Sequence, residues 1–183
     1  VYKRQFMQVI EYCHAMGLDM IQGDHEDAPG QLELNWTFDD VLRNSDRLAT
    51  YRQICEQVAR ENNLIACFMT KPFMGVSASG CHTNISLWKG GKESVNRLHN
   101  DILPGMDDVF TYRTGGENTF MPDTDDQQMP GKVGLQCVGG IVNHLGALTA
   151  IGSSTVNSYR RLWDTGFWAP VFADWGYENR TTG

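Results

Sequence analysis

Two carboxylates that flank a short turn are the first residues whose types and spacing could carry chemistry. Glu26 follows His25, and Glu33 comes after the turn residues Pro29 and Gly30. A Pro-Gly turn can fold the chain so that both carboxylates point into one cavity. Such a pair suits hard divalent cations such as Mg²⁺ or Mn²⁺, which take oxygen ligands. The spacing alone leaves a second interpretation open, in which these are ordinary surface acids of a solvated hairpin.

A glycine- and serine-bearing loop followed by a polar strand is the second candidate. The segment KPFMGVSASGCHTNISLW places the loop at residues 75–80, where backbone groups can approach a ligand closely. In the strand expected over residues 81–88, His82, Asn84 and Ser86 share one face. This row is typical of a ligand-facing strand, but a solvated edge strand gives the same pattern. The segment is not a P-loop, because G-x-x-x-x-G-K-[ST] is absent.

Arginines near the end of the chain are the third candidate. Arg160 and Arg161 end the segment NSYRR, and Arg180 lies further along. The planar guanidinium group suits the recognition of carboxylates and phosphates. Taken alone, the pattern favours ordinary surface arginines over a binding site.

The hydrophobic periodicity predicts the elements that must hold these residues. Apolar residues at helical spacing predict a helix from about Tyr2 to Met16, ended by Gly17. Strict alternation predicts a strand over residues 31–36, with Glu33 facing a cleft. The core face of that strand would hold Leu32, Leu34 and Trp36, and the cleft face Gln31, Glu33 and Asn35.

The rest of the chain mixes helices, strands and one long loop. A second helix is expected to start near Thr37, Asp39 and Asp40 and to run to about Asn62. Strands are expected at 64–69 and at 81–88, the second with Ile85 and Leu87 on its apolar face. The remaining expected elements are an acidic loop at 101–130, a buried helix at 134–153, a loop at 163–170 and a strand at 171–175. Because strands and helices interleave without regular βαβ alternation, we expect an antiparallel α+β fold.

Composition limits the classes of function. The 183 residues are 41% hydrophobic and carry a formal net charge of −7, which argues against general nucleic-acid binding. No apolar run is expected to approach the roughly 20 residues of a membrane span. The five cysteines are odd in number and widely spaced, so we expect reduced thiols in a cytoplasmic protein, mostly as small core residues.

Three segments in the right order resemble the catalytic domain of the glutamine synthetase family. HEDAPGQLE, starting at His25, resembles the family segment H-E-x-A-P-G-Q-x-E. KPFMGVSASGCHTNISLW resembles K-P-x-x-G-x-x-G-S-G-x-H-x-x-x-S-L, and NSYRRL with GFWAP and ENR resembles N-S-Y-K-R-L…G-Y-E-A-P…R-N-R. The resemblance covers nearly the whole chain and implies that residues 1–183 are part of a catalytic domain with a curved antiparallel sheet and flanking helices, incomplete at both ends.

The resemblance also implies roles for individual residues. It implies two metal ions, Mg²⁺ or Mn²⁺, with Glu26 and Glu33 holding one and His82 the other. Arg161 matches the arginine that holds glutamate, Arg180 one that steadies the transferred phosphoryl group, and Ser86, Phe38 and Asn84 match positions near the nucleotide. The substrate-binding set would be Ser77, Ala78, His82 and Arg161, and the catalytic set Arg161, Arg180 and Trp168.

The activity implied is an ATP-dependent ligase. ATP would phosphorylate the γ-carboxylate of L-glutamate, and ammonia or an alkylamine would displace the phosphate. The family further implies a homo-oligomer in stacked rings, a dodecamer, located in the cytoplasm and using neither nucleic acid nor membrane. We also expect a longer polypeptide, because ligands that the chemistry needs should precede Val1 and follow Gly183, so the chain alone should be inactive.

Three departures from the family pattern bear on these roles. Ser77 and Ala78 stand where members often carry Asn-Gly, and Asn84 replaces a common second histidine. Trp168 in GFWAP replaces the glutamate that helps to bind ammonium. An indole face suits a methyl-bearing cation, which favours a γ-glutamylmethylamide synthetase-like enzyme. The alternatives are a catalytically inactive structural or regulatory member and a guanidino-phosphotransferase of the same general fold.

Overall fold

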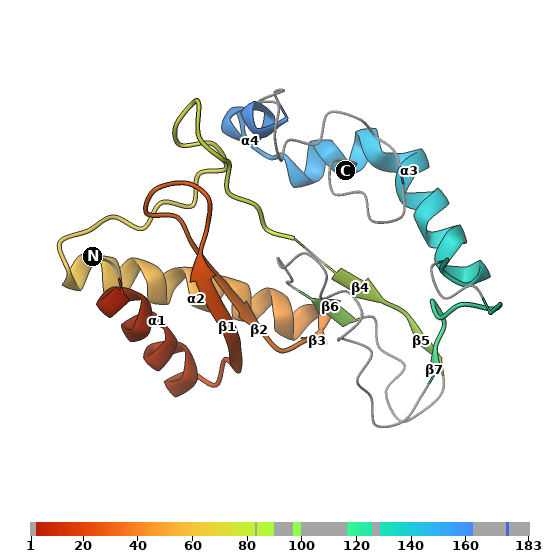
Figure 1. Ribbon diagram of the computed structural model, residues 1–183, viewed down its shortest axis with the longest axis horizontal. Coiled ribbons are helices and arrows are strands. Elements are labelled where there is room, and N and C mark those ends of the chain that lie inside the picture. Colours follow the sequence, from red (N-terminus) through yellow and green to blue (C-terminus); the bar gives the residue numbers. More distant parts are fainter. Residues whose placement is uncertain are drawn as a thin grey trace. The chain divides into compact units, whose positions relative to one another are not determined.

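The computed structural model describes residues 3–82, 84–89, 97–99, 117–125, 129–162 and 175 (Figure 1). The chain separates into two compact units, each described here by itself. The first combines Val1–Phe68 with Cys81–Gly116, and the second combines Met69–Gly80 with Glu117–Gly183. The expected loop at 163–170, most of the strand at 171–175 and most of the acidic loop lie outside the described residues.

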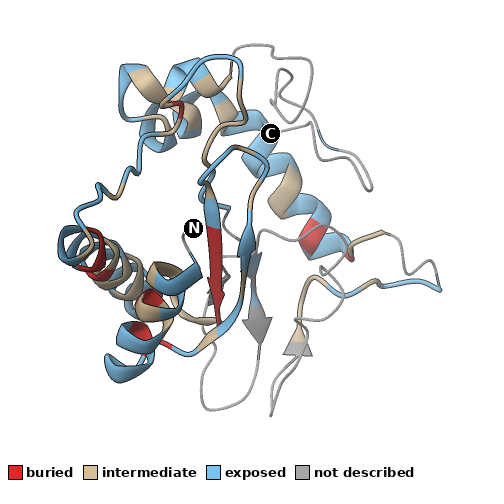
Figure 2. Cartoon of the chain, turned by 60° about the vertical axis from the view of Figure 1, so that its left-hand side comes forward, coloured by how far each residue is buried: buried red, intermediate tan, exposed pale blue. Residues whose placement is uncertain are grey.

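Two helices and a hairpin build the core of the first unit. The elements are α1 (Lys3–Ala15), β1 (Met20–His25), β2 (Leu32–Trp36) and α2 (Val41–Glu61). Gly17 follows α1 with a φ of 77°, the left-handed conformation that glycine adopts at the end of a helix. The buried cluster consists of Val9, Cys13, Leu18, Leu34, Ile54 and Val58 (Figure 2). The first helix and the strand at 31–36 are therefore confirmed, and α2 confirms the second helix.

The antiparallel α+β class is confirmed by the strand pairings. β1 pairs antiparallel with β2, with an irregularity between Met20 and Gln22. A second sheet has the order β3-β6-β4, formed by β3 (Asp39–Asp40), β6 (Arg97–His99) and β4 (Asn84–Ser86), and both of its pairings are antiparallel. Two further short strands are β5 (Trp88–Lys89) and β7 (Glu117–Asn118).

Helix α2 begins later than the sequence suggests. Asp39 and Asp40 form strand β3, and the Asp40 side chain caps the helix by accepting a hydrogen bond from the Arg43 amide at 2.9 Å. An aspartate N-cap satisfies one of the free amides of the first turn. The pair of aspartates therefore ends a strand and starts a helix.

The long helix of the second unit is exposed where burial was expected. The unit contains α3 (Lys132–Gly152) and α4 (Val156–Arg161). Within α3, Gly134 is the one buried residue among those described, so the helix is confirmed and its burial is not. By length and apolar composition alone, α3 could cross a membrane, which corrects the expectation of no such run. The same two properties also suit a helix that packs inside a larger domain.

Three other expectations fail on exposure or pairing. Residues 64–69 form no strand, and Ile65 is 91% exposed, because this apolar run has no partner strand in the described part of the chain. Ile85 and Leu87, expected on an apolar face, are exposed. Among the described residues of 81–88, strand structure is found in β4 and at the start of β5. Leu32 is also exposed.

The five cysteines are free thiols, but they are not mostly core residues. Cys13 is fully buried, Cys55 is half-buried, and Cys67 and Cys81 are exposed. Burial, with a smaller contribution from the nearby Cys55, raises the pKa of the Cys13 thiol from 9.0 to about 11. Burial likewise raises the pKa of Cys55 to about 11.

We expect Cys13 and Cys55 to resist alkylation by iodoacetamide at pH 8, where Cys67 reacts, because the reagent attacks the thiolate. Since both folded pKa values lie above 9.0, the stability from the neutral thiols is fully present below pH 9. That contribution is lost as the pH rises through about 11. Peptide mass mapping would measure the order in which the cysteines are alkylated, with denatured protein as the control. Labelling of Cys13 before Cys67 would contradict it.

Candidate functional site

The turn between β1 and β2 fixes the backbone beside Glu26. The Glu26 amide donates to the Gln31 carbonyl at 2.9 Å, and the Gln31 amide donates to the Ala28 carbonyl at 3.0 Å. Gly30 has a φ of 79°, which an L-residue rarely adopts. The Glu26 carboxylate accepts a hydrogen bond from the Asp27 amide at 3.2 Å and is half-buried. The turn thus holds this carboxylate close to the end of the hairpin.

Glu33 is a buried carboxylate on the hairpin. It is 6% exposed, and its Oε1 accepts a hydrogen bond from Asn35 Nδ2 at 3.1 Å. Asn35 is itself 4% exposed, and its Oδ1 has no hydrogen-bond partner among the described residues. Burying an ionised carboxylate is unfavourable unless other groups compensate it, so this arrangement is typical of a functional group.

The strand register places a further carboxylate on the same face. Asp24 lies directly opposite Glu33, and Gln22 lies opposite Asn35. Directly opposed acids repel each other, and a cation between them removes that repulsion. Sequence reasoning missed Asp24. Its position two residues before Glu26 in a strand was the available signal.

The donor chemistry of this hairpin face fits a hard divalent cation. It presents two carboxylates, Asp24 and Glu33, and one buried amide oxygen without a partner among the described residues, and these are the ligand types that Mg²⁺ and Mn²⁺ take. No group of three His, Cys, Asp or Glu side chains close enough to hold a metal occurs in the described part of the chain. The exposed His82 is therefore not brought into one cluster with Glu26 and Glu33. Their assignment as ligands stays a prediction.

The three positions expected near a nucleotide lie in or directly beside one small sheet. Phe38 directly precedes β3, while Asn84 and Ser86 lie on β4. Both strands pair with β6, through Asp39 opposite Leu98 and Ile85 opposite Leu98. The sheet therefore links residues that are far apart in the sequence.

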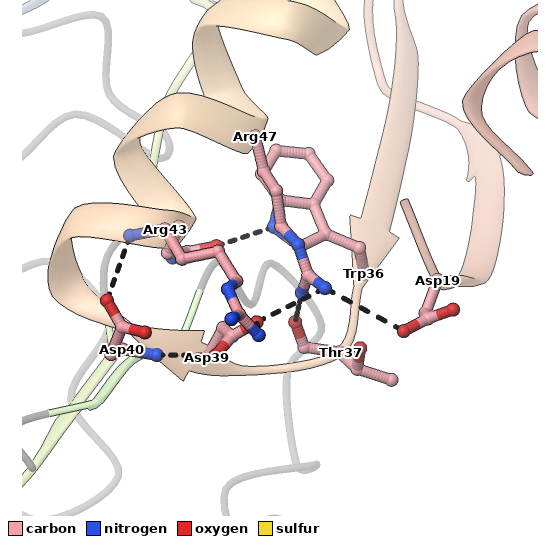
Figure 3. A network of polar contacts seen from close by, with 8 residues as sticks. Asp19, Trp36, Thr37, Asp39, Asp40, Arg43 and Arg47 are labelled. Carbon is pink, nitrogen blue, oxygen red and sulfur yellow. Dashed lines mark hydrogen bonds and ion pairs between the residues drawn. The ribbon is translucent and has the colours of Figure 1, made fainter. Parts of the chain in front are cut away.

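A polar network at the start of α2 fixes the segment that contains Phe38 (Figure 3). Arg47 Nη2 lies 3.2 Å from an Asp39 carboxylate oxygen, and Nη1 donates to the Thr37 carbonyl at 3.4 Å. Trp36 Nε1 donates to Asn44 Oδ1 at 2.6 Å, and both of these residues are buried. The first turns of α2 thus hold the chain on both sides of Phe38.

The second unit carries the candidate substrate loop. Ser77 and Ala78 are half-buried in the loop that starts after Lys71. Lys71 is 3% exposed, and its backbone amide and carbonyl both bond to the side chain of Asn157 on α4. Arg161 is half-buried at the end of the same helix. The structure therefore brings the start of the second motif, up to Gly80, together with the NSYRR segment within one unit.

Two predicted catalytic residues, Trp168 and Arg180, lie outside the described residues. The roles predicted for the other residues from sequence stay predictions. Sequence reasoning missed Asn157, which begins the motif NSYRR, because a neutral carboxamide does not indicate by its type which distant group it contacts.

The chain matches a known sequence family over nearly its full length. Residues 2–116 and 110–183 match the family described as the glutamine synthetase catalytic domain. Proteins named glutamine synthetase from Rhizobium meliloti and Pyrococcus furiosus are 32% and 33% identical over 179 and 174 residues. Each alignment covers 95% of this chain but only 36% or 33% of the relative. The chain thus spans about a third of the length of these relatives.

Solved structures show the same likeness in three dimensions. A structure titled "Apo GmaS without ligand" matches with a TM-score of 0.67 and 30% identity, covering 88% of this chain and 32% of the solved chain. A second, titled "GmaS/ADP complex-Conformation 1", gives the same TM-score and identity and covers 89% of this chain.

Proposed function

The chain belongs to the glutamine synthetase family, and on that premise we propose that the full-length protein is an ATP-dependent ligase. It phosphorylates the γ-carboxylate of L-glutamate and transfers the γ-glutamyl group to ammonia or a small amine. The observation that carries this proposal is the match to the catalytic domain across residues 2–116 and 110–183. The structural neighbour whose title names ADP is consistent with a nucleotide substrate.

The proposal gives individual residues separate roles in this chemistry. Glu26 and Glu33 would hold a divalent cation, which would supply positive charge to neutralise the phosphates. In the second unit, Arg161 binds a carboxylate of glutamate, since a guanidinium group recognises carboxylates through paired hydrogen bonds. Arg180 stabilises the charge of the phosphoryl group during its transfer. Phosphorylation is required because a free carboxylate is a poor electrophile.

A coupled assay of ADP release by the full-length enzyme tests the proposal. We expect release to require Mg²⁺ or Mn²⁺, glutamate and an amine together, with γ-glutamyl amide and phosphate formed in equal amounts. An inactive structural or regulatory member would release no ADP under any of these conditions. A guanidino-phosphotransferase would instead release ADP with a guanidino substrate and no amine, and either outcome would refute the ligase proposal.

Trp168 supports a small alkylamine as the acceptor, because an indole face favours a methyl-bearing cation while a carboxylate favours ammonium. We expect the full-length enzyme to prefer methylamine over ammonia by about 10-fold in kcat/KM. The variant Trp168→Glu should shift that preference back toward ammonia. Steady-state kinetics with both amines, before and after the substitution, would measure the shift. A parent enzyme that prefers ammonia would identify the acceptor as ammonia.

A further inference from the structure

The side chain of Asn157 bonds to both backbone groups of Lys71, although the two residues are 86 positions apart. The Lys71 amide donates to Asn157 Oδ1 at 2.8 Å, and Asn157 Nδ2 donates to the Lys71 carbonyl at 2.7 Å. A carboxamide that pairs with one residue in this way imitates the neighbouring strand of a sheet. Lys71 is nearly fully buried, so these backbone groups have little access to water as a substitute.

The loop that follows Lys71 is closed by two further contacts. Lys71 Nζ donates to the Val76 carbonyl, and the Ser79 amide donates to the Thr70 carbonyl at 2.8 Å. Both contacts tie the far side of the loop back to its first residues. A displacement of Lys71 would therefore move the half-buried Ser77 and Ala78 with it.

Helix α4 connects the same carboxamide to Arg161. Asn157 and Arg161 are four residues apart on this helix, so they lie on one face of it. The helix is capped by Thr155, whose Oγ1 accepts a hydrogen bond from the Ser158 amide at 3.2 Å. The cap fixes the start of a helix that is only six residues long.

We propose that Asn157 is a positioning residue that sets the distance between the Ser77–Ala78 loop and Arg161, and thereby the affinity for the amino-acid substrate. This inference rests on the proposed function. A substrate such as glutamate carries two carboxylates and one ammonium group. The arginine can bind a carboxylate, and a loop of small residues lets its backbone come close to the rest of the amino acid. The arginine and the loop must be held at a fixed distance from each other to bind one substrate molecule.

The test compares Asn157→Asp with the full-length parent enzyme. Aspartate has the same shape but cannot donate to the Lys71 carbonyl, so it places one oxygen against another. We expect the KM for glutamate to rise on the order of 10-fold while the KM for ATP stays within twofold. Asn143→Asp on the exposed part of α3 makes the same chemical change without this contact and serves as control. Its KM for glutamate should equal that of the parent.

Asn157→Gln covers the case in which the aspartate variant does not fold. Glutamine keeps the carboxamide but moves it by one methylene, and we expect a smaller rise in the KM for glutamate. An unchanged KM for glutamate in whichever variant folds would overturn the proposal. A parallel loss of kcat and of both affinities would also overturn it, since that indicates a merely structural role. A parent enzyme without glutamate-dependent ADP release would refute the proposed function itself.

Discussion

Replacing Glu33 with glutamine in the full-length enzyme is expected to lower metal-dependent ligase activity by at least about 10²-fold. Glutamine fills the same volume, and its amide oxygen can still accept the hydrogen bond that Asn35 Nδ2 gives to Glu33 at 3.1 Å. The negative charge disappears, and a neutral amide oxygen is a much weaker ligand for a hard cation than a carboxylate. We therefore expect the fold to persist while the cation site fails.

Two measurements separate these effects. Mn²⁺ binding, followed by electron paramagnetic resonance, should weaken along with activity, and the circular dichroism spectrum should stay unchanged. Glu11→Gln removes one carboxylate from the exposed surface of α1 and should leave both properties at the parent values. Parent-like turnover of Glu33→Gln at saturating Mg²⁺ would contradict the assignment of Glu33 as a ligand.

Local signals in the sequence predicted the elements of the first unit well. Gly17 marks the end of α1 because only a residue tolerant of positive φ ends a helix in this way. The alternation in residues 31–36 gave the correct strand and placed Glu33 and Asn35 on one face. It did not predict that both faces would be buried toward the end of β2, since alternation reports the sides of a strand and not what covers them.

Strand pairing and helix burial depend on distant parts of the chain, and local sequence patterns did not predict them. A short apolar run such as residues 64–69 predicts a strand only if another strand pairs with it, and none does in the described residues. The apolar composition of α3 suggested burial, but burial requires a surface to pack against.

In the candidate site, too, local sequence signals identified some residues, while those that depend on distant contacts were missed. Glu26, Glu33 and Arg161 carry charges and stand in recognisable motifs, so their residue types alone raised hypotheses. Asn157 is neutral, and its importance depends on the backbone of Lys71, which is 86 residues away. Because every residue except proline has the same backbone amide and carbonyl, the residue type at position 71 does not indicate that a distant side chain bonds to its backbone.

Replacing Arg47 with methionine is expected to destabilise the segment from Trp36 to Asp40 by about 2 kcal/mol. Arg47 holds this segment through Asp39 at 3.2 Å and the Thr37 carbonyl at 3.4 Å, and it also lies 3.8 Å from Asp19 (Figure 3). Its side chain is 14% exposed and that of Asp39 is 19% exposed, so solvent screens the pair only partly. Methionine keeps much of the apolar stem but leaves Asp39, among the described residues, with the exposed Arg43 as its ion-pair partner beside the hydrogen bond from the Asp40 amide.

Hydrogen exchange followed by mass spectrometry would measure this loss in the amides of Thr37 to Asp40, as a roughly 30-fold faster exchange. The variant Arg43→Met is the matched control, because Arg43 contacts the same Asp39 oxygen at 3.3 Å but is 66% exposed. It should cost no more than about 0.5 kcal/mol, the usual contribution of an exposed ion pair at the surface. Because Phe38 lies inside the segment, the KM for ATP should rise in Arg47→Met and not in Arg43→Met. Equal exchange rates in the two variants would mean that the burial of Arg47 adds nothing to the local stability of the segment from Trp36 to Asp40.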